Sequence, residues 1–227
     1  MARAFRVAAT DFYYQSIRLV PANLAWGAGF VAVLAIAAWL SPILALLAAP
    51  LLCLPFVGIV GMAAQIVRGK DVVLSDMPTA MRAHGLPALA AGGVLAAATV
   101  VFAANVGAGI GMGGPVGWGF ASLAAWGLAG SWMLALAFWP LLVDPARATV
   151  PVARRTRLAA LVVLAQPLRF AALAAALALI LVVSTIAFAA LVSVSVAFIA
   201  LVAARVVLPA ADEFEARVAG DAATGPA

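Results

Sequence analysis

The chain has 227 residues, of which 67% are hydrophobic and 9% are charged, and its formal net charge is +5. A soluble domain of this size has too small a core to hide so much apolar surface, so the composition excludes an ordinary soluble protein and predicts one membrane domain over 1–227. The Lys and Arg residues are spread between apolar runs, which excludes a separate basic domain for nucleic acid.

The first apolar run, residues 22–40, is predicted to cross the bilayer. It is too long for the core of a cleavable signal peptide, and Trp26 and Trp39 stand near its two ends, where indole rings prefer the interface. Residues 11–21 mix apolar and polar side chains, which is typical of a short helix in the headgroup layer. The uncharged pair Ser41 and Pro42 then predicts a tight turn.

The second span, residues 43–67, contains two prolines and two glycines that predict an irregular helix. Each proline removes a backbone donor, so the span should kink or break. The glycines should let a neighbouring helix approach closely, although a broken helix also presents free backbone groups to a substrate in many transporters. The residues concerned are Pro50, Pro55, Gly58 and Gly61.

A polar connector, residues 68–86, leads to a third span at 87–106, in which Asn105 is the strongly polar member. The glycine-rich stretch 107–117 predicts a flexible outer turn. A fourth span follows at 118–143. Residues 144–166 are basic and lead into a second surface helix.

The remaining apolar stretch, residues 168–208, is too long for one crossing. As a single helix it would reach about 60 Å at 1.5 Å per residue, which is twice the thickness of the hydrocarbon core. It is therefore predicted to fold into spans at 168–187 and 190–208, although no Gly or Pro marks the turn. Residues 209–227 are predicted to form a disordered cytoplasmic tail.

The charge distribution predicts the topology of these six spans. Every Lys, Arg, Asp and Glu and the one His fall in segments on the N-terminal side, and the three opposite turns carry no formal charge. The positive-inside rule then places both termini in the cytoplasm of a bacterial plasma membrane. The expected fold is all-α and polytopic, with three helical hairpins and short interfacial helices on the cytoplasmic face.

The second span and its connector, PFVGIVGMAAQIVRGKDVVLSDMPTAMRAHGLP, resemble the YesL-like family of small bacterial membrane proteins, a domain of unknown function. The resemblance lies in the Pro/Gly-bearing span, the charged step Arg68-Gly69-Lys70-Asp71, Asp76 and the basic helix at Arg82. It departs where the family usually has an aromatic after the acidic residue, because Met77 and Pro78 follow Asp76. The resemblance implies a six-helix protein associated with carbohydrate import.

Two functions from different classes remain open. The first is an accessory or assembly subunit of a membrane complex, plausibly for carbohydrate uptake, which docks a membrane-protein partner or a second copy through its charged cytoplasmic face. The docking residues expected are Asp71, Asp76, Arg82, Arg154, Arg155 and Arg157.

The second is a small transporter or substrate-binding subunit, for which the possible lining residues are Gln65, Asn105, Trp126 and Trp132. An enzyme is not expected, because catalysis needs paired carboxylates, a nucleophile with a base, or metal ligands at a common depth. One Cys and one His supply no metal site, and no cofactor is expected. The sequence alone does not identify a substrate, a partner or an oligomeric state.

Overall fold

The computed structural model describes residues 2–223, and among them every regular element is helical. This confirms the all-α expectation. The α-helices are α1 (Ala2–Tyr14), α2 (Ser16–Trp39), α3 (Pro42–Ala48), α4 (Cys53–Val67), α5 (Asp76–Met112), α6 (Gly114–Val143), α7 (Val152–Ala165), α8 (Pro167–Ile186), α9 (Phe188–Ala190) and α10 (Val196–Ala223). Short 3₁₀ turns occur at η1 (Ala49–Leu52) and η2 (Pro145–Arg147), and a π-helical turn occurs at η3 (Leu191–Ser195).

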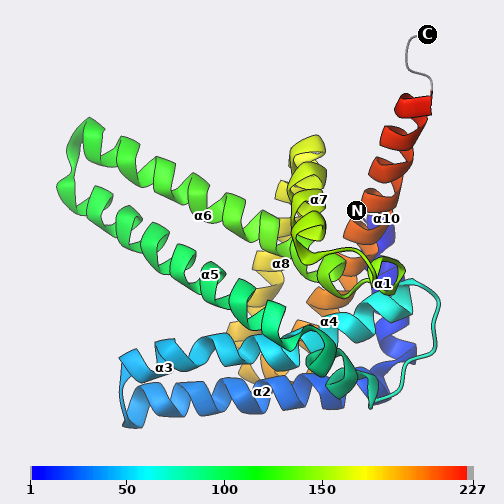
Figure 1. The fold of residues 1–227 in the computed structure, drawn as a ribbon. Coiled ribbons are helices and arrows are strands. Elements are labelled where there is room, and N and C mark those ends of the chain that lie inside the picture. The colour runs from blue at the N-terminus through cyan, green and yellow to red at the C-terminus, as the bar shows by residue number, and fades with distance from the viewer. Residues whose placement is uncertain (1, 224–227) are drawn as a thin grey trace.

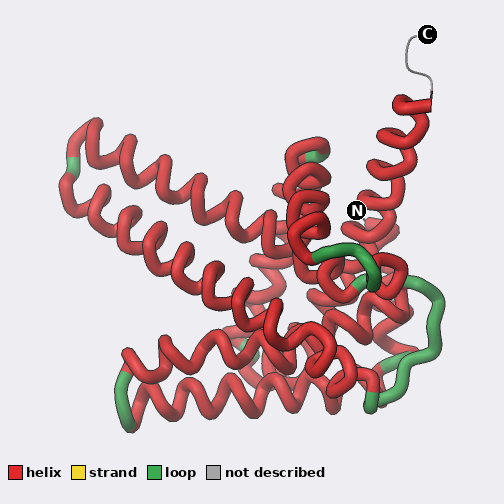
Figure 2. The backbone as a smooth tube through the Cα atoms, in the orientation of Figure 1, coloured by secondary structure: helices red, strands yellow, loops and turns green. Residues whose placement is uncertain are grey.

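Within these residues, six stretches are long and apolar enough to cross a membrane. They are α2, the run from α3 to α4, α5, α6, α8, and the run from α9 through α10. In Figure 1, α5 and α6 lie side by side and project away from α2 and α3, which form a separate pair. Figure 2 shows the short turn between α5 and α6 at the far tip, and the longer loop between α4 and α5 at the opposite end. The helices therefore diverge from one shared end.

The second apolar run is broken into three pieces at its prolines. Pro50 lies in the 3₁₀ turn η1, and Pro55 lies in the first turn of α4. Beyond this break α4 is buried, and a Cβ built on Gly58 would lie 2.6 Å from Cγ of Met77, while one built on Gly61 would lie 2.8 Å from Cβ of Ala80. These distances are too short for any side chain, so α5 crosses α4 where glycine occurs.

Two boundaries differ from the sequence interpretation. The third apolar span and the polar helix before it form one continuous helix, α5, with Pro87 inside it. The expected glycine-rich turn at 107–117 is mostly helical, because the chain reverses only at Gly113 and Gly114, whose φ angles of 63° and 65° are left-handed. Gly109 and Gly117 instead allow α5 and α6 to touch, since a Cβ on Gly117 would lie 2.5 Å from the carbonyl oxygen of Gly109.

The C-terminal residues also differ from expectation. The tail expected to be disordered from 209 onward continues α10 through Ala223, and residues 224–227 of that prediction lie outside the described part. The helix persists because Asp212 and Glu215, three positions apart on one face, both reach cationic partners, while Phe214 packs against the core.

The break between α8 and α10 is held by Asn23 of α2. Its side-chain amide is fully buried, donates to the carbonyl oxygens of Leu191 and Val192 at 3.1 and 2.7 Å, and accepts from the N–H of Ala197 at 2.7 Å. These bonds satisfy backbone groups around the π-helical turn, which an apolar side chain would leave unpaired.

Candidate functional site

A cluster of charged side chains joins the C-terminal ends of α4 and α6, the turn η2 and the C-terminal half of α10. We call Arg68, Asp144, Arg147, Asp212 and Glu215 the ion cluster. Arg68 donates to both carboxylate oxygens of Asp144 at 3.0 and 2.6 Å and to Asp212 at 2.7 Å. Arg147 donates to Asp144, to Asp212 at 2.8 Å and to Glu215. Segments far apart in the sequence are thus tied together at one end of the bundle.

The ion cluster is partly withdrawn from water. Asp144 and Arg147 are buried, whereas Asp212 and Glu215 keep contact with solvent. Burial alone would raise the pKa of the Asp144 carboxyl, but hydrogen bonds from Arg68, from the N–H of Ala146 and from Arg147 hold that pKa below its usual value. Asp144 is therefore ionised at neutral pH, and its role is electrostatic and structural.

Arg155, which the sequence placed on a docking surface, is buried. Its guanidinium donates to the carbonyl oxygen of Leu142 at the end of α6, and to those of Ala148 and Val150 at 2.8 Å each. Burial lowers its pKa. Because these bonds close the turn after α6, Arg155 is unavailable to a partner, which corrects that part of the sequence interpretation.

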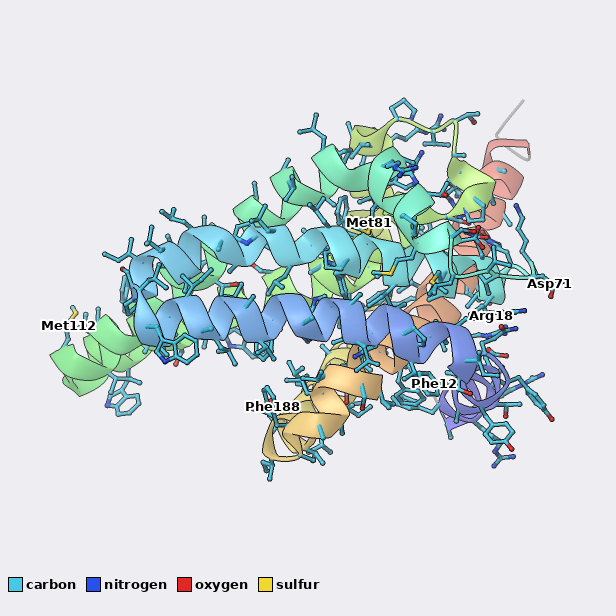
Figure 3. The ribbon with its side chains drawn as sticks, turned by 90° about the horizontal axis from the view of Figure 1, so that it is seen from below. Phe12, Arg18, Asp71, Met81, Met112 and Phe188 are labelled. Carbon is cyan, nitrogen blue, oxygen red and sulfur yellow. The ribbon has the colours of Figure 1, made fainter. Side chains whose placement is uncertain are left out.

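The other docking candidates keep more solvent contact. Asp71, Arg82, Arg154 and Arg157 are exposed, and half-buried Asp76 accepts from the N–H of Val73 at 2.8 Å. Within residues 2–223 none of these five forms an ion pair. Figure 3 shows Asp71 and Arg18 at the end of the molecule opposite Met112. Among the described residues, these five charged side chains are therefore not linked to one another by ion pairs.

A second candidate is an apolar cavity of about 510 Å³ between α2, α4, α5, α6, α8 and α10, which we call the main cavity. Indole rings form much of its wall, and two hydroxyl groups also line it. The wall residues most relevant here are Trp26, Phe56, Thr99, Ser131, Trp132 and Trp139. A volume of this size is within the range of small-molecule sites in proteins.

Of the four lining residues expected from the sequence, Trp132 alone borders the main cavity. Trp126 is 74% exposed on the outer side of α6, and Asn105 and Gln65 are half-buried elsewhere on α5 and α4. The structure therefore does not bring the four together. Trp26 and Trp139, which the sequence marked only as interfacial residues, also line the main cavity.

Sequence reasoning also missed the ion cluster. A signal was present, because Arg68, Asp144 and Asp212 are each among the first charged residues after an apolar run. Opposite charges at matching helix ends indicate pairing across the bundle. Asn23 carried a similar signal, as a single amide in an apolar run, since polar residues in membrane spans usually bond to other helices.

These features define an all-helical protein with membrane-spanning character, an ion cluster at one end and an apolar cavity among the spans. Comparisons with protein-family models, with curated proteins and with solved structures find no match to the chain.

Proposed function

We propose that the chain is an accessory or assembly subunit of a bacterial plasma-membrane complex and performs no catalysis of its own. The single observation that carries this proposal is the exposure of α5 and of the outer part of α6. We call residues 93–130, which form the outer parts of these two helices, the arm. In the most apolar 18-residue stretch of α5 only 11% of residues are buried, compared with 72% for the last span.

The arm carries a stripe of mostly small side chains whose glycines meet no neighbour among residues 2–223. Its positions alternate by four and three residues, so they lie on one face of α5, and all but half-buried Gly93 are exposed. A Cβ built on Gly93, Gly107 or Gly111 would meet nothing within 4 Å. The stripe consists of Gly93, Ala97, Val100, Ala104, Gly107 and Gly111.

Small residues are the usual contact surface between helices in a bilayer. Lipid gives helices no hydrophobic reason to associate, so close backbone approach supplies the attraction. A partner's transmembrane helix packed on this stripe would gain contacts that acyl chains do not match. We therefore place the partner on the arm, with the exposed charges Asp71, Arg82, Arg154 and Arg157 as a second contact at the other end.

The finer architecture belongs to the same proposal. The three-hairpin arrangement, the interfacial position of α1 and α7, and the cytoplasmic location of both termini rest on the charge distribution. The link to carbohydrate import rests on the resemblance to the YesL-like family over the second span and its connector. The alternative function, a small transporter or substrate-binding subunit, is favoured by one observation, the indole-lined main cavity.

Site-specific photocrosslinking in native membranes tests the partner. A photoreactive amino acid is placed at Ala104 or Gly107 on the stripe, and at Gly119 of α6 as a matched control, where a built Cβ also meets nothing within 4 Å. We expect one membrane protein to be captured from both stripe positions and not from the control. Capture of a second copy of the chain would make it a homo-oligomer, and capture of lipid alone would overturn the proposal.

A further inference from the structure

The main cavity has walls that do not collapse readily. The ring of Trp26 stacks on Phe30 with centroids 5.3 Å apart, and Trp139 meets Phe56 edge to face at 5.2 Å. The indole N–H of Trp132 reaches the carbonyl oxygen of Ala174 at 3.4 Å. Trp26 and Trp132 are therefore held by partners outside the cavity, and Trp139 is held by Phe56, another residue of the wall. A space framed in this way is preformed, in contrast to a gap that neighbouring side chains fill by changing rotamer.

The two hydroxyl groups in the wall already donate within their own helices. The hydroxyl of Thr99 donates to the carbonyl oxygen of Leu95 at 2.8 Å, and that of Ser131 donates to Gly127 at 2.9 Å, each within its own helix. No lining residue of the main cavity carries a charge. Water needs two to four polar partners to be held in a cavity, and a sugar or an ion needs more. The wall therefore offers mainly apolar surface to a ligand.

The main cavity extends along α6. Its lining runs from Leu128 to Trp139, which corresponds to about 16 Å of helix at 1.5 Å per residue. The cavity is only half enclosed, and the helices around it are the ones with membrane-spanning character. The medium at its opening is then the hydrocarbon of the bilayer, where linear alkyl chains are the most abundant apolar molecules.

We propose that the main cavity binds an acyl chain of a bilayer lipid. The chain lies along α6 between the indole rings, makes dispersion contacts with them, and needs no hydrogen bond from the protein. The site is separate from the arm stripe and from the ion cluster, so it does not depend on the accessory-subunit proposal.

The distribution of tryptophans allows a direct test. Three of the six indoles line the main cavity, and the other three, Trp39, Trp118 and Trp126, are exposed elsewhere. The full-length chain with Trp39→Phe, Trp118→Phe and Trp126→Phe reports fluorescence from the cavity alone. It is reconstituted into phosphatidylcholine vesicles whose acyl chains carry bromine, which quenches indoles on contact, and into unbrominated vesicles for reference.

Cavity-filling substitutions separate quenching inside the cavity from quenching at the outer surface. In this background, Ala96→Phe on α5 and Ser131→Phe on α6 each place a ring in the main cavity. Val94→Phe is the matched control, because Val94 lines a different hollow of about 340 Å³ that does not contain the indoles. We expect strong quenching in the parent, at least a twofold loss of quenching in either filled variant, and no loss in the control.

Several outcomes would overturn the proposal. Equal quenching in the parent and in a filled variant of unchanged thermal stability would mean that bromine reaches the indoles only from outside. Quenching by aqueous acrylamide without quenching by brominated chains would mean that the cavity holds water. Protection from brominated lipid by a co-purified protein would assign the cavity to a partner's helix. Two filled variants from different helices keep the test valid if one of them fails to fold.

Discussion

The charged end of the bundle and the arm use opposite means of holding helices in place. At the charged end, most of α4, the last turns of α6 and the first half of α10 are buried. The ion cluster joins these three helices. In the arm, residues 93–130, the buried positions are the small residues Gly109, Gly117, Ala121 and Ala124. The arm therefore depends on α5 and α6 touching each other, whereas the charged end depends on contacts between helices distant in sequence.

This difference distinguishes the end of the molecule whose contacts stabilise the fold from the end that leaves surface exposed. In a bilayer, burying an apolar side chain against a protein gains little over burying it in lipid, so polar bonds and close packing decide which helices stay together. The charged end has both. Within residues 2–223 the arm has close packing along one seam, and its other face is exposed.

The largest effect should come from removing the carboxylate at the centre of the ion cluster. Asp144→Ala leaves Arg68 and buried Arg147 without their shared anion, and breaking a buried ion pair in this way costs about 3–5 kcal/mol. Thermal unfolding in mild detergent should show a large drop in midpoint. The matched control is Asp71→Ala, an exposed acid with no ion pair among the described residues, which should stay within about 0.5 kcal/mol of the parent. Equal behaviour of the two variants would remove the ion cluster as a source of stability.

A smaller effect is expected where α4 meets α5. Gly61→Leu forces a side chain into a contact in which even a Cβ would lie 2.8 Å from Ala80, and such overpacking costs about 1–3 kcal/mol. A Cβ built on Gly93 of the arm meets nothing within 4 Å, so Gly93→Leu should leave the unfolding midpoint unchanged, while it weakens partner binding if the stripe is used. A Gly61→Leu protein as heat-stable as its parent would contradict the packing role.

The smallest effect is the response to acid. The pKa of Asp144 in the fold lies below the value of about 3.9 for an unfolded aspartate, so the unfolded chain binds the proton first as the pH falls. The stability that Asp144 contributes is thus complete at neutral pH and is lost as the pH falls below about 4. Unfolding midpoints measured from pH 7 to pH 3 should fall for the parent and fall less for Asp144→Asn. Identical slopes would show that other groups cause the acid sensitivity.

The sequence was sufficient for the parts of the fold that depend on local composition. Six apolar runs separated by charged or glycine-bearing segments predict six spans, because the bilayer sets one length for all of them. Pairing across the bundle was not accessible in the same way. Arg68 and Asp144 are 76 positions apart, and Asn23 and Val192 are 169 apart, so only the folded helices bring them together.

The boundaries that were wrong have a common physical cause. Glycines at 107–111 and Pro87 were read as breaks, but helical backbone satisfies its own hydrogen bonds, which an apolar medium strongly favours. The site predictions were limited by helix rotation, since Trp126 and Trp132 are six positions apart and point to different surroundings. A one-dimensional pattern did not determine which of them faces the main cavity.

The connections made by α10 also set an order for biosynthesis. As the chain leaves the ribosome, Arg68 and Arg147 are made before their acidic partners Asp212 and Glu215. Asp11 likewise cannot form its ion pair with Arg205, in which a guanidinium nitrogen and a carboxylate oxygen are 2.6 Å apart, until the last span is made. The nascent protein therefore carries an excess of positive charge at these helix ends until the last span is made, and a chain truncated before residue 205 would keep Arg68 and Arg147 without Asp212 and Glu215.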